Sequence, residues 1–140
     1  MEIENKKCVM ILDEDLPLGI QANTAAILGI TLGKHVPETV GPDVCDKSGR
    51  EHLGIIAIPV PVLKASREHI RELRRRLYQP EFAQVVTVDF SDVAQGCNVY
   101  DEYQAHAAAT REEDFRYFGL GLCGPKKLVN QLSGSLPLLR

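Results

Sequence analysis

Short apolar runs alternate along the chain with segments of helical character, and this alternation constrains the fold more than any other feature. The runs resemble buried strands in length and composition; they are Cys8–Leu12, Leu53–Ile58, Gln84–Val88 and Tyr117–Leu122. The segments that we expect to be helical are Ile20–Leu32, the residues from Ser66 to Pro80, Val99–Arg111 and the residues after Pro125. Four strand–helix pairs in succession predict one α/β domain over residues 1–140, a three-layer α/β/α sandwich with a central four-stranded mixed sheet.

The first two helices are expected to pack differently. Ile20–Leu32 is rich in alanine and leucine, with polar residues mainly at its start, so we expect a largely buried helix. The second helix has Ile70, Leu73 and Leu77 at amphipathic spacing, with Ser66 as its N-cap.

The charge balance disfavours nucleic acid as a partner. The chain has 16 Lys and Arg residues against 19 Asp and Glu residues, a net charge of -3, whereas nucleic-acid-binding domains usually carry a basic excess. The clearest basic stripe lies on the second predicted helix and comprises Arg67, Arg71, Arg74 and Arg75. Glu68 and Glu72 interleave with these arginines, which indicates a solvated, ion-paired helix face rather than a phosphate-binding surface.

The sequence predicts a soluble, cytoplasmic protein with no membrane partner. No apolar run approaches the roughly 20 residues that a membrane span requires, and the N-terminal MEIENKK is not a signal peptide. The cysteines Cys8, Cys45, Cys97 and Cys123 are well separated, so neither a disulfide framework nor a zinc site is expected, and we expect no cofactor. Cys45 lies between His35 and His52 in an irregular segment, but the neighbouring acids disfavour a reactive thiolate.

Polar residues gather after the first and third predicted strands. Asp15 follows the first strand, Asn23 lies in the first turn of the next helix, and Asp89 and Asp92 follow the third strand. Open α/β folds bind ligands at the carboxyl ends of their strands, so Asp15 and Asp89 would face one cleft if the two strands are close neighbours. Paired carboxylates there could perform general acid–base chemistry. The alternative is a set of solvated loop acids, with an aspartate near a helix N-terminus.

A glycine-rich segment precedes the last helix. In GLCGPK, the backbone N–H groups around Gly121 and Gly124 could hold an anion at the start of the helix. The alternative is a tight turn at residues 123–125, with Pro125 as the first helical residue.

Two stretches of the chain resemble the type-2 peptidyl-tRNA hydrolases. That family opens with a strand and the motif D-L-x-M-G-x-G-K-x-A-A-Q entering a helix; the matching residues here are Asp15, Leu16, Gly19 and Ala25, with Leu18 in place of the methionine. Tyr117–Pro125 is similar to the final strand and turn of that family, and Leu128–Leu139 to its closing helix and tail. The chain looks most like the uncharacterised bacterial relatives of that fold, which are grouped as domain-of-unknown-function family number 2000. The resemblance implies the type-2 peptidyl-tRNA hydrolase fold.

The resemblance does not carry over the chemistry of that family. Its catalytic lysine aligns with Ala22, its following glutamine with Ala26, and its second motif glycine with Gln21. Alanine supplies neither a charge nor a hydrogen bond, so peptidyl-tRNA hydrolysis by that mechanism is not expected.

The leading hypothesis is therefore a small-ligand-binding or hydrolase-like domain without that lysine. The residues predicted to line its pocket are Asp15, Gln21, Asn23, Asp89, Asp92, Gly121 and Gly124. One alternative is a non-catalytic interaction scaffold that forms a homodimer. A weaker alternative is a diverged hydrolase of peptidyl- or aminoacyl-RNA.

Overall fold

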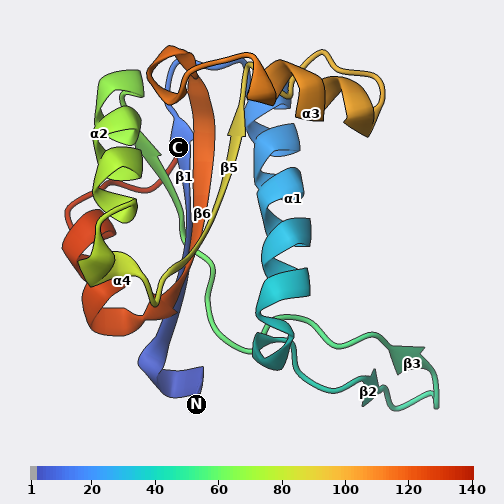
Figure 1. Ribbon diagram of the computed structural model, residues 1–140. Helices are drawn as coiled ribbons and strands as arrows, with labels where there is room; N and C mark the ends of the chain where they lie inside the picture. The colour runs from blue at the N-terminus through green and yellow to red at the C-terminus, as the bar shows by residue number, and fades with distance from the viewer. Residues whose placement is uncertain (1–2) are drawn as a thin grey trace.

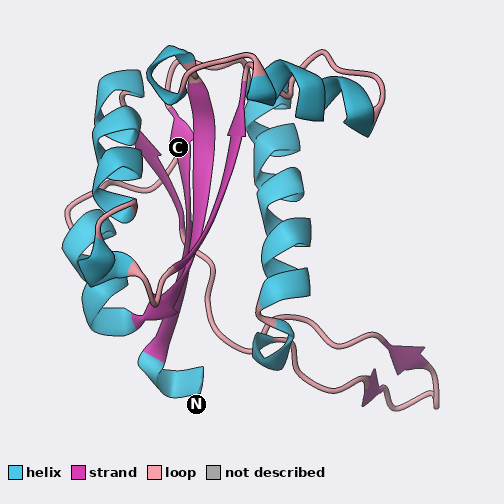
Figure 2. Cartoon of the chain, in the orientation of Figure 1, coloured by secondary structure: helices cyan, strands magenta, loops and turns pink. Residues whose placement is uncertain are grey.

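The structure is a computed structural model that describes residues 3–140 (Figures 1 and 2). The α-helices are α1 (Leu18–His35), α2 (Arg67–Leu77), α3 (Tyr100–Ala108) and α4 (Lys126–Ser133). The strands are β1 (Lys6–Asp13), β2 (Val44–Cys45), β3 (Glu51–His52), β4 (Val62–Ala65), β5 (Val86–Ser91) and β6 (Tyr117–Pro125). Short 3-10 helices cover Ile3–Asn5, Pro37–Thr39, Pro80–Phe82 and Glu112–Asp114.

The central sheet has four strands in the order β4-β1-β6-β5. β1 pairs in parallel with β4, and β6 pairs antiparallel with both β1 and β5. Cys8 lies opposite Cys123, and Leu12 lies opposite Gly119. The predicted α/β class and mixed four-stranded sheet are confirmed.

Helices cover both faces of this sheet, and each face has its own hydrophobic cluster (Figure 2). On one face, α1 packs Leu28 and Leu32 with Met10 and Phe118. On the other face, α2 and α4 bury a cluster that includes Ile70, Leu73, Leu120 and Val129. The side chains of β1 alternate between the two clusters, as the period of a strand dictates.

Gly121 allows α1 to pack closely against β6. A Cβ atom at this position would lie 2.9 Å from Val88 Cγ1 and 3.2 Å from Leu28 Cβ. The residue therefore fills a packing position in the middle of the sheet, and no turn begins there. The predicted turn at residues 123–125 is wrong, because β6 continues through Cys123 to Pro125 before α4 begins.

The predicted strand at Leu53–Ile58 is also wrong. Leu53 is 83% exposed and Ile55 is 79% exposed, and the strand that pairs with β1 is β4 further along the chain. Residues 41–58 instead form an arm that carries the short pair β2 and β3 and extends from the end of α1 (Figure 1). Its base is tied to the preceding segment by a bridge between Val40 and Ile56.

The first two predicted helices are confirmed in position, but α1 is less buried than expected. It buries Gln21, Thr24, Leu28 and Leu32, whereas Leu18 is 78% exposed and Ile30 is 77% exposed. In α2, the Ser66 hydroxyl accepts a hydrogen bond from the His69 N–H, as an N-cap does. Among residues 3–140, no helix is both long and apolar enough to cross a membrane.

Candidate functional site

Strands β1, β4 and β5 all end at the same edge of the sheet, which we call the upper pole because it lies at the top of Figure 1. The loop after β1, the N-termini of α1 and α2, and the segment between α3 and β6 meet there. Ligand sites of open α/β folds lie at edges of this kind.

Asp13, the last residue of β1, is a fully buried carboxylate at this pole. Its Oδ1 accepts a hydrogen bond of 2.9 Å from the Asp15 N–H. Its backbone oxygen accepts a hydrogen bond of 3.1 Å from Gln21 Nε2, which ties α1 to the end of β1. Its Oδ2 has no hydrogen-bond partner among residues 3–140.

Arg116 lies just before β6 and supplies the nearest cation. Its Nη2 lies 3.6 Å from Asp13 Oδ2, an ion pair without a hydrogen bond. Asp92 holds the Arg116 backbone by two hydrogen bonds of 3.0 Å, one in each direction. The guanidinium lies 5.6 Å from the centre of the Phe118 ring. The side chain is 36% exposed, yet its Nε is buried and has no partner among residues 3–140.

The Asp13–Arg116 ion pair makes fewer hydrogen bonds than its burial requires. A buried charge costs several kcal/mol unless it is paired and hydrogen-bonded in good geometry, and each unsatisfied buried polar group costs roughly 1–3 kcal/mol. Buried polar groups without partners are rare in folded proteins, and one explanation for them is a functional role. The Asp13–Arg116 pair is therefore the feature of the upper pole that purely structural packing explains least.

A polar cavity of about 260 Å³ adjoins Arg116. Its lining residues are Arg67, Arg71, Glu113, Asp114, Phe115, Arg116 and Tyr117. Arg71 is already engaged, because it donates hydrogen bonds to the carbonyl oxygens of Phe115 and Glu112. Burial, together with the hydrogen bond that its hydroxyl donates to Glu112, raises the pKa of Tyr117, which keeps this phenol neutral. A second cavity, of about 400 Å³, is lined by Gln21, Glu14 and Lys64 among others.

The structure brings together three of the seven predicted site residues. Asp15, Gln21 and Asp92 all bond to the Asp13–Arg116 pair, although through backbone groups of that pair or of their own. Asn23 lies on the exposed side of α1, and none of the cavities described above includes it.

The other three predicted residues lie elsewhere. Asp89 belongs to β5 and forms an ion pair with Arg74 of α2 at 2.9 Å, so it does not share a cleft with Asp15 as expected. Gly121 lies beneath α1, and Gly124 lies near the end of β6, opposite Lys7 and away from the upper pole.

The arginines of α2 also differ from expectation. Arg71 and Arg74 bond to the segment before β6 and to β5, instead of pairing with Glu68 and Glu72 along the helix. The Arg74 guanidinium also lies 3.9 Å from the centre of the Tyr78 ring. These two cations therefore hold α2 against the rest of the molecule.

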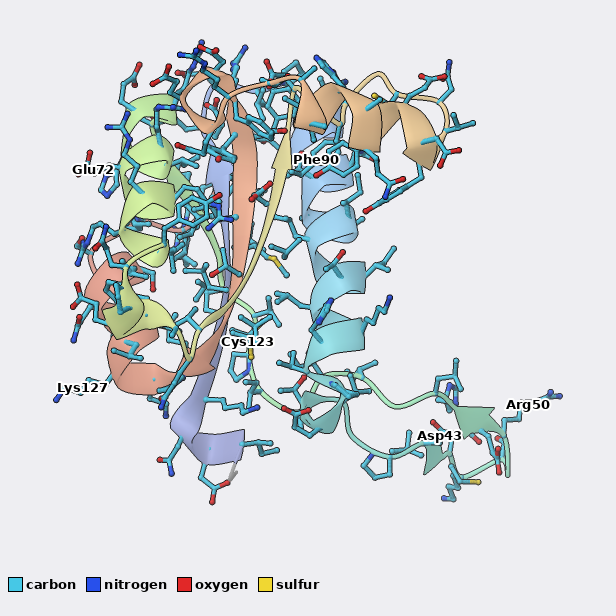
Figure 3. All side chains as sticks on the ribbon, in the orientation of Figure 1. Asp43, Arg50, Glu72, Phe90, Cys123 and Lys127 are labelled. Atoms are coloured by element: carbon cyan, nitrogen blue, oxygen red, sulfur yellow. The ribbon has the colours of Figure 1, made fainter. Side chains whose placement is uncertain are left out.

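The cysteines form no obvious reactive site. Cys8 and Cys123 are buried partners across β1 and β6 (Figure 3 labels Cys123). The hydrogen bond to Cys123 and burial raise the pKa of Cys8, and that same hydrogen bond lowers the pKa of Cys123 to about 7. Cys45 is exposed on the arm, where Asp46 pairs with His52. Within the described residues, no three His, Cys, Asp or Glu side chains are grouped as a metal site requires.

Comparisons with known proteins address the fold but not the chemistry. A family model described as a protein of unknown function, DUF2000, matches residues 6–140. A solved structure of a protein of unknown function from Agrobacterium tumefaciens strain C58 is similar, with a TM-score of 0.85 and 17% sequence identity. The similarity covers 96% of this chain and 97% of that one. A search of curated proteins finds no match.

Proposed function

The chain belongs to the DUF2000 family, whose description assigns no function, and we propose that it binds a small anionic ligand at the upper pole. A phosphate monoester or a small carboxylate is the ligand class that the charges favour. The observation that carries this proposal is the buried Asp13–Arg116 pair, which lies beside a cavity lined by arginines. Within residues 3–140, neither Asp13 Oδ2 nor Arg116 Nε has a hydrogen-bond partner.

The positive groups of the cavity support an anion. Arg67 is exposed at the first position of α2, and within residues 3–140 its side chain makes no hydrogen bond or ion pair. The N-terminus of a helix carries a partial positive charge and unpaired N–H groups that favour anions. Arg67 and Arg116 are thus the two cations of the cavity that are available to bind a ligand. Arg71 is instead held in the wall of the cavity by its own hydrogen bonds.

Asp13 lets the proposed site also bind a hydrogen-bond donor or a cationic group of the ligand. Asp13 is fully buried and does not itself line the cavity, so it becomes available only when the Arg116 guanidinium turns towards an anion in the cavity; its Oδ2 can then accept a hydrogen bond from a donor group of the same ligand, such as a hydroxyl or an amine. A ligand of this kind would satisfy both groups of the pair at once. The same carboxylate could act as a general base if the ligand were a substrate, which is the hydrolase form of the proposal.

The comparisons give the family but do not name the fold. We propose that this single domain has the type-2 peptidyl-tRNA hydrolase fold, on the strength of the Asp15-Leu16 entry motif and the Tyr117–Pro125 strand. Ala22 lies exposed on α1 where that family has its lysine, so the proposed anion site is held by different residues.

Thermal-shift and calorimetric titrations test the proposal. The probes are inorganic phosphate, nucleoside monophosphates, sugar phosphates and small dicarboxylates, each compared with chloride at equal ionic strength. Binding to the folded state raises the melting temperature by mass action. Because a hydrogen bond to a charged group is worth about 1.5–3 kcal/mol, Arg116→Gln should weaken binding of the best probe by roughly 10- to 100-fold.

The matched control is Arg75→Gln on the exposed face of α2, which should bind the probe like the parent protein. Equal affinity in Arg116→Gln would show that the upper pole is not the binding site. Absence of binding by every probe would favour the non-catalytic scaffold instead.

A further inference from the structure

The outer face of α1 is apolar where a surface helix usually carries charges. From Leu18 to Gly33 the helix has no charged residue. Leu18, Ala22, Ala26 and Ile30 are exposed and lie four residues apart, so they form one ridge along the helix. A ridge of this kind normally packs against another element.

Two projections flank this ridge. Figure 1 shows that the arm of residues 41–58 and α3 both extend from the α1 side of the molecule, one from each end of the helix. Most of the large exposed hydrophobic side chains of residues 3–140 belong to α1, the arm and the start of α3; besides Leu18 and Ile30 they include Val44, Leu53, Ile55, Val99 and Tyr100. We call this surface the bracket: it consists of the exposed ridge of α1 in the middle, with the arm of residues 41–58 at one end and α3 at the other.

The base of the arm is anchored, because Ile56 and Ile58 pack on the hydrophobic cluster under α1, but the rest of the arm is mostly exposed within one copy of the chain. Its two strands pair through Val44 with His52 and Cys45 with Glu51, and all four residues are exposed. A two-stranded hairpin without a hydrophobic face to pack on is marginally stable in water. A surface that covers Leu53 and Ile55 would remove this deficit.

We propose that the bracket is the interface of a homodimer in which two α1 helices pack against each other in antiparallel orientation. The helix face alone is too small, because an 18-residue helix about 27 Å long and about 10 Å wide offers roughly 270 Å² in projection. A stable interface buries about 800 Å² per partner. The arm and α3 add to the interface area only if they also contact the partner. A two-fold axis lets the arm and α3 of both copies make these contacts.

Charge selects the antiparallel arrangement over the parallel one. The first turn of α3 carries Asp101 and Glu102, and the turn of the arm carries Lys47 and Arg50, all exposed. A parallel pair of α1 helices would place α3 against α3 and arm against arm, with like charges facing each other. An antiparallel pair places the arm of each copy against α3 of the other, so that opposite charges meet.

Two of the three acids of the arm are engaged within the arm itself. Asp43 accepts a hydrogen bond from the Gly54 N–H, and Asp46 accepts hydrogen bonds from the N–H groups of Ser48 and Arg50 and pairs with His52. Both carboxylates are thus turned towards the arm itself. Glu51, the third acid, is exposed on β3 and directly follows Arg50, so the positive charge that the arm offers is that of Lys47 and Arg50 at its turn. Figure 3 labels Asp43 and Arg50 and shows the Arg50 side chain extending away from the arm.

Two charge-reversal variants test the interface and its orientation. One carries Lys47→Glu and Arg50→Glu, and the other carries Asp101→Lys and Glu102→Lys. All four positions are exposed, and the one side-chain hydrogen bond within residues 3–140 that is lost is the bond that Glu102 Oε2 accepts from the Asn98 N–H, so both variants should fold. Sedimentation and light scattering over a range of concentrations should show a dimer for the parent chain and a dimer dissociation constant at least tenfold weaker for each variant. An equimolar mixture of the two variants should form a heterodimer with an affinity within about threefold of the parent. At one of its two contacts, the now acidic arm of one variant meets the now basic α3 of the other, so opposite charges again face each other.

The control reverses Lys126 and Lys127 on α4, on the far side of the sheet, and should leave the dimer unchanged. Circular dichroism confirms that each variant is folded. A parent chain that stays monomeric at about 100 μM would overturn the proposal. So would a dimer that ignores both reversals, or a mixture that dimerises no better than its components.

Discussion

Ala22 marks the clearest chemical difference between this chain and the type-2 peptidyl-tRNA hydrolase pattern. The residue lies exposed on α1 and offers no cation to a substrate at that point. Loss of one electrostatic stabiliser of a transition state costs roughly 10²–10³ in rate. We predict that the purified protein hydrolyses a labelled peptidyl-tRNA at least 100-fold more slowly than an authentic type-2 enzyme assayed in parallel. Comparable turnover would show that another residue supplies the charge.

Three of the predicted site residues lie at the upper pole beside the Asp13–Arg116 pair, but the sequence did not point to the pair itself. Asp15 and Asp92 follow strands, and Gln21 lies in the first turn of the helix after β1. The ends of parallel strands meet at one edge of a sheet, so the proximity of these residues could be predicted. Asp13 was not among the predicted site residues, although it directly follows the apolar run and ends β1. Arg116 was missed, because its contact with Asp13 depends on β6 lying beside β1, and residue spacing does not encode that neighbour. A charged residue immediately next to a buried strand is the signal that could have marked both.

Packing between elements predicts that glycine-to-alanine substitutions at two positions change the free energy of unfolding in opposite directions. Gly121→Ala should destabilise the protein by about 1–3 kcal/mol, because its Cβ would press on Val88 and on Leu28 of α1. Gly29→Ala should stabilise it by about 0.5–1 kcal/mol, because this glycine lies within α1 and the nearest atom to its Cβ would be Met10 Cε at 3.9 Å. Urea unfolding of the two variants and the parent gives both numbers. A loss of stability in Gly29→Ala, or none in Gly121→Ala, would contradict the described approach of α1 to the sheet.

Local pattern predicted which segments are helices better than it predicted which apolar run is a strand. Ser66 and the spacing of Ile70, Leu73 and Leu77 specify α2 by themselves, since capping and amphipathic period are local properties. Leu53–Ile58 has the composition of a buried strand, yet it belongs to the arm, while the shorter Val62–Ala65 pairs with β1. Composition cannot distinguish a run that is covered by its own sheet from one that remains exposed.

At the scale of the whole molecule, the alternation of strands and helices was sufficient to predict a mixed sheet with helices on both faces. The exposed ridge of α1 could not be separated from a buried helix in the sequence, because both lack charges. What distinguishes them is whether a partner lies within the same chain. The homodimer proposed here would account for that ambiguity, because it would bury the ridge after all.

The central claim is that Asp13 and Arg116 form a ligand site that the fold tolerates at some cost in stability. The most direct test compares the free energy of unfolding of Asp13→Asn with that of Asp89→Asn. Asp89 makes a hydrogen-bonded ion pair of 2.9 Å with Arg74, so its loss should cost about 1–3 kcal/mol by leaving that arginine unpaired. Asparagine at position 13 keeps an acceptor for the Asp15 N–H and removes a buried charge whose Oδ2 has no hydrogen bond in the described part of the chain, residues 3–140.

The account predicts that Asp13→Asn leaves the free energy of unfolding unchanged or raises it by up to about 2 kcal/mol. A poorly compensated buried charge has been removed, and the Arg116 side chain, which is 36% exposed against 13% for Arg74, can turn to solvent. Asp89→Asn should be less stable than the parent in the same urea titration. A loss in Asp13→Asn as large as that in Asp89→Asn, or larger, would contradict the account and make the Asp13–Arg116 pair a structural ion pair.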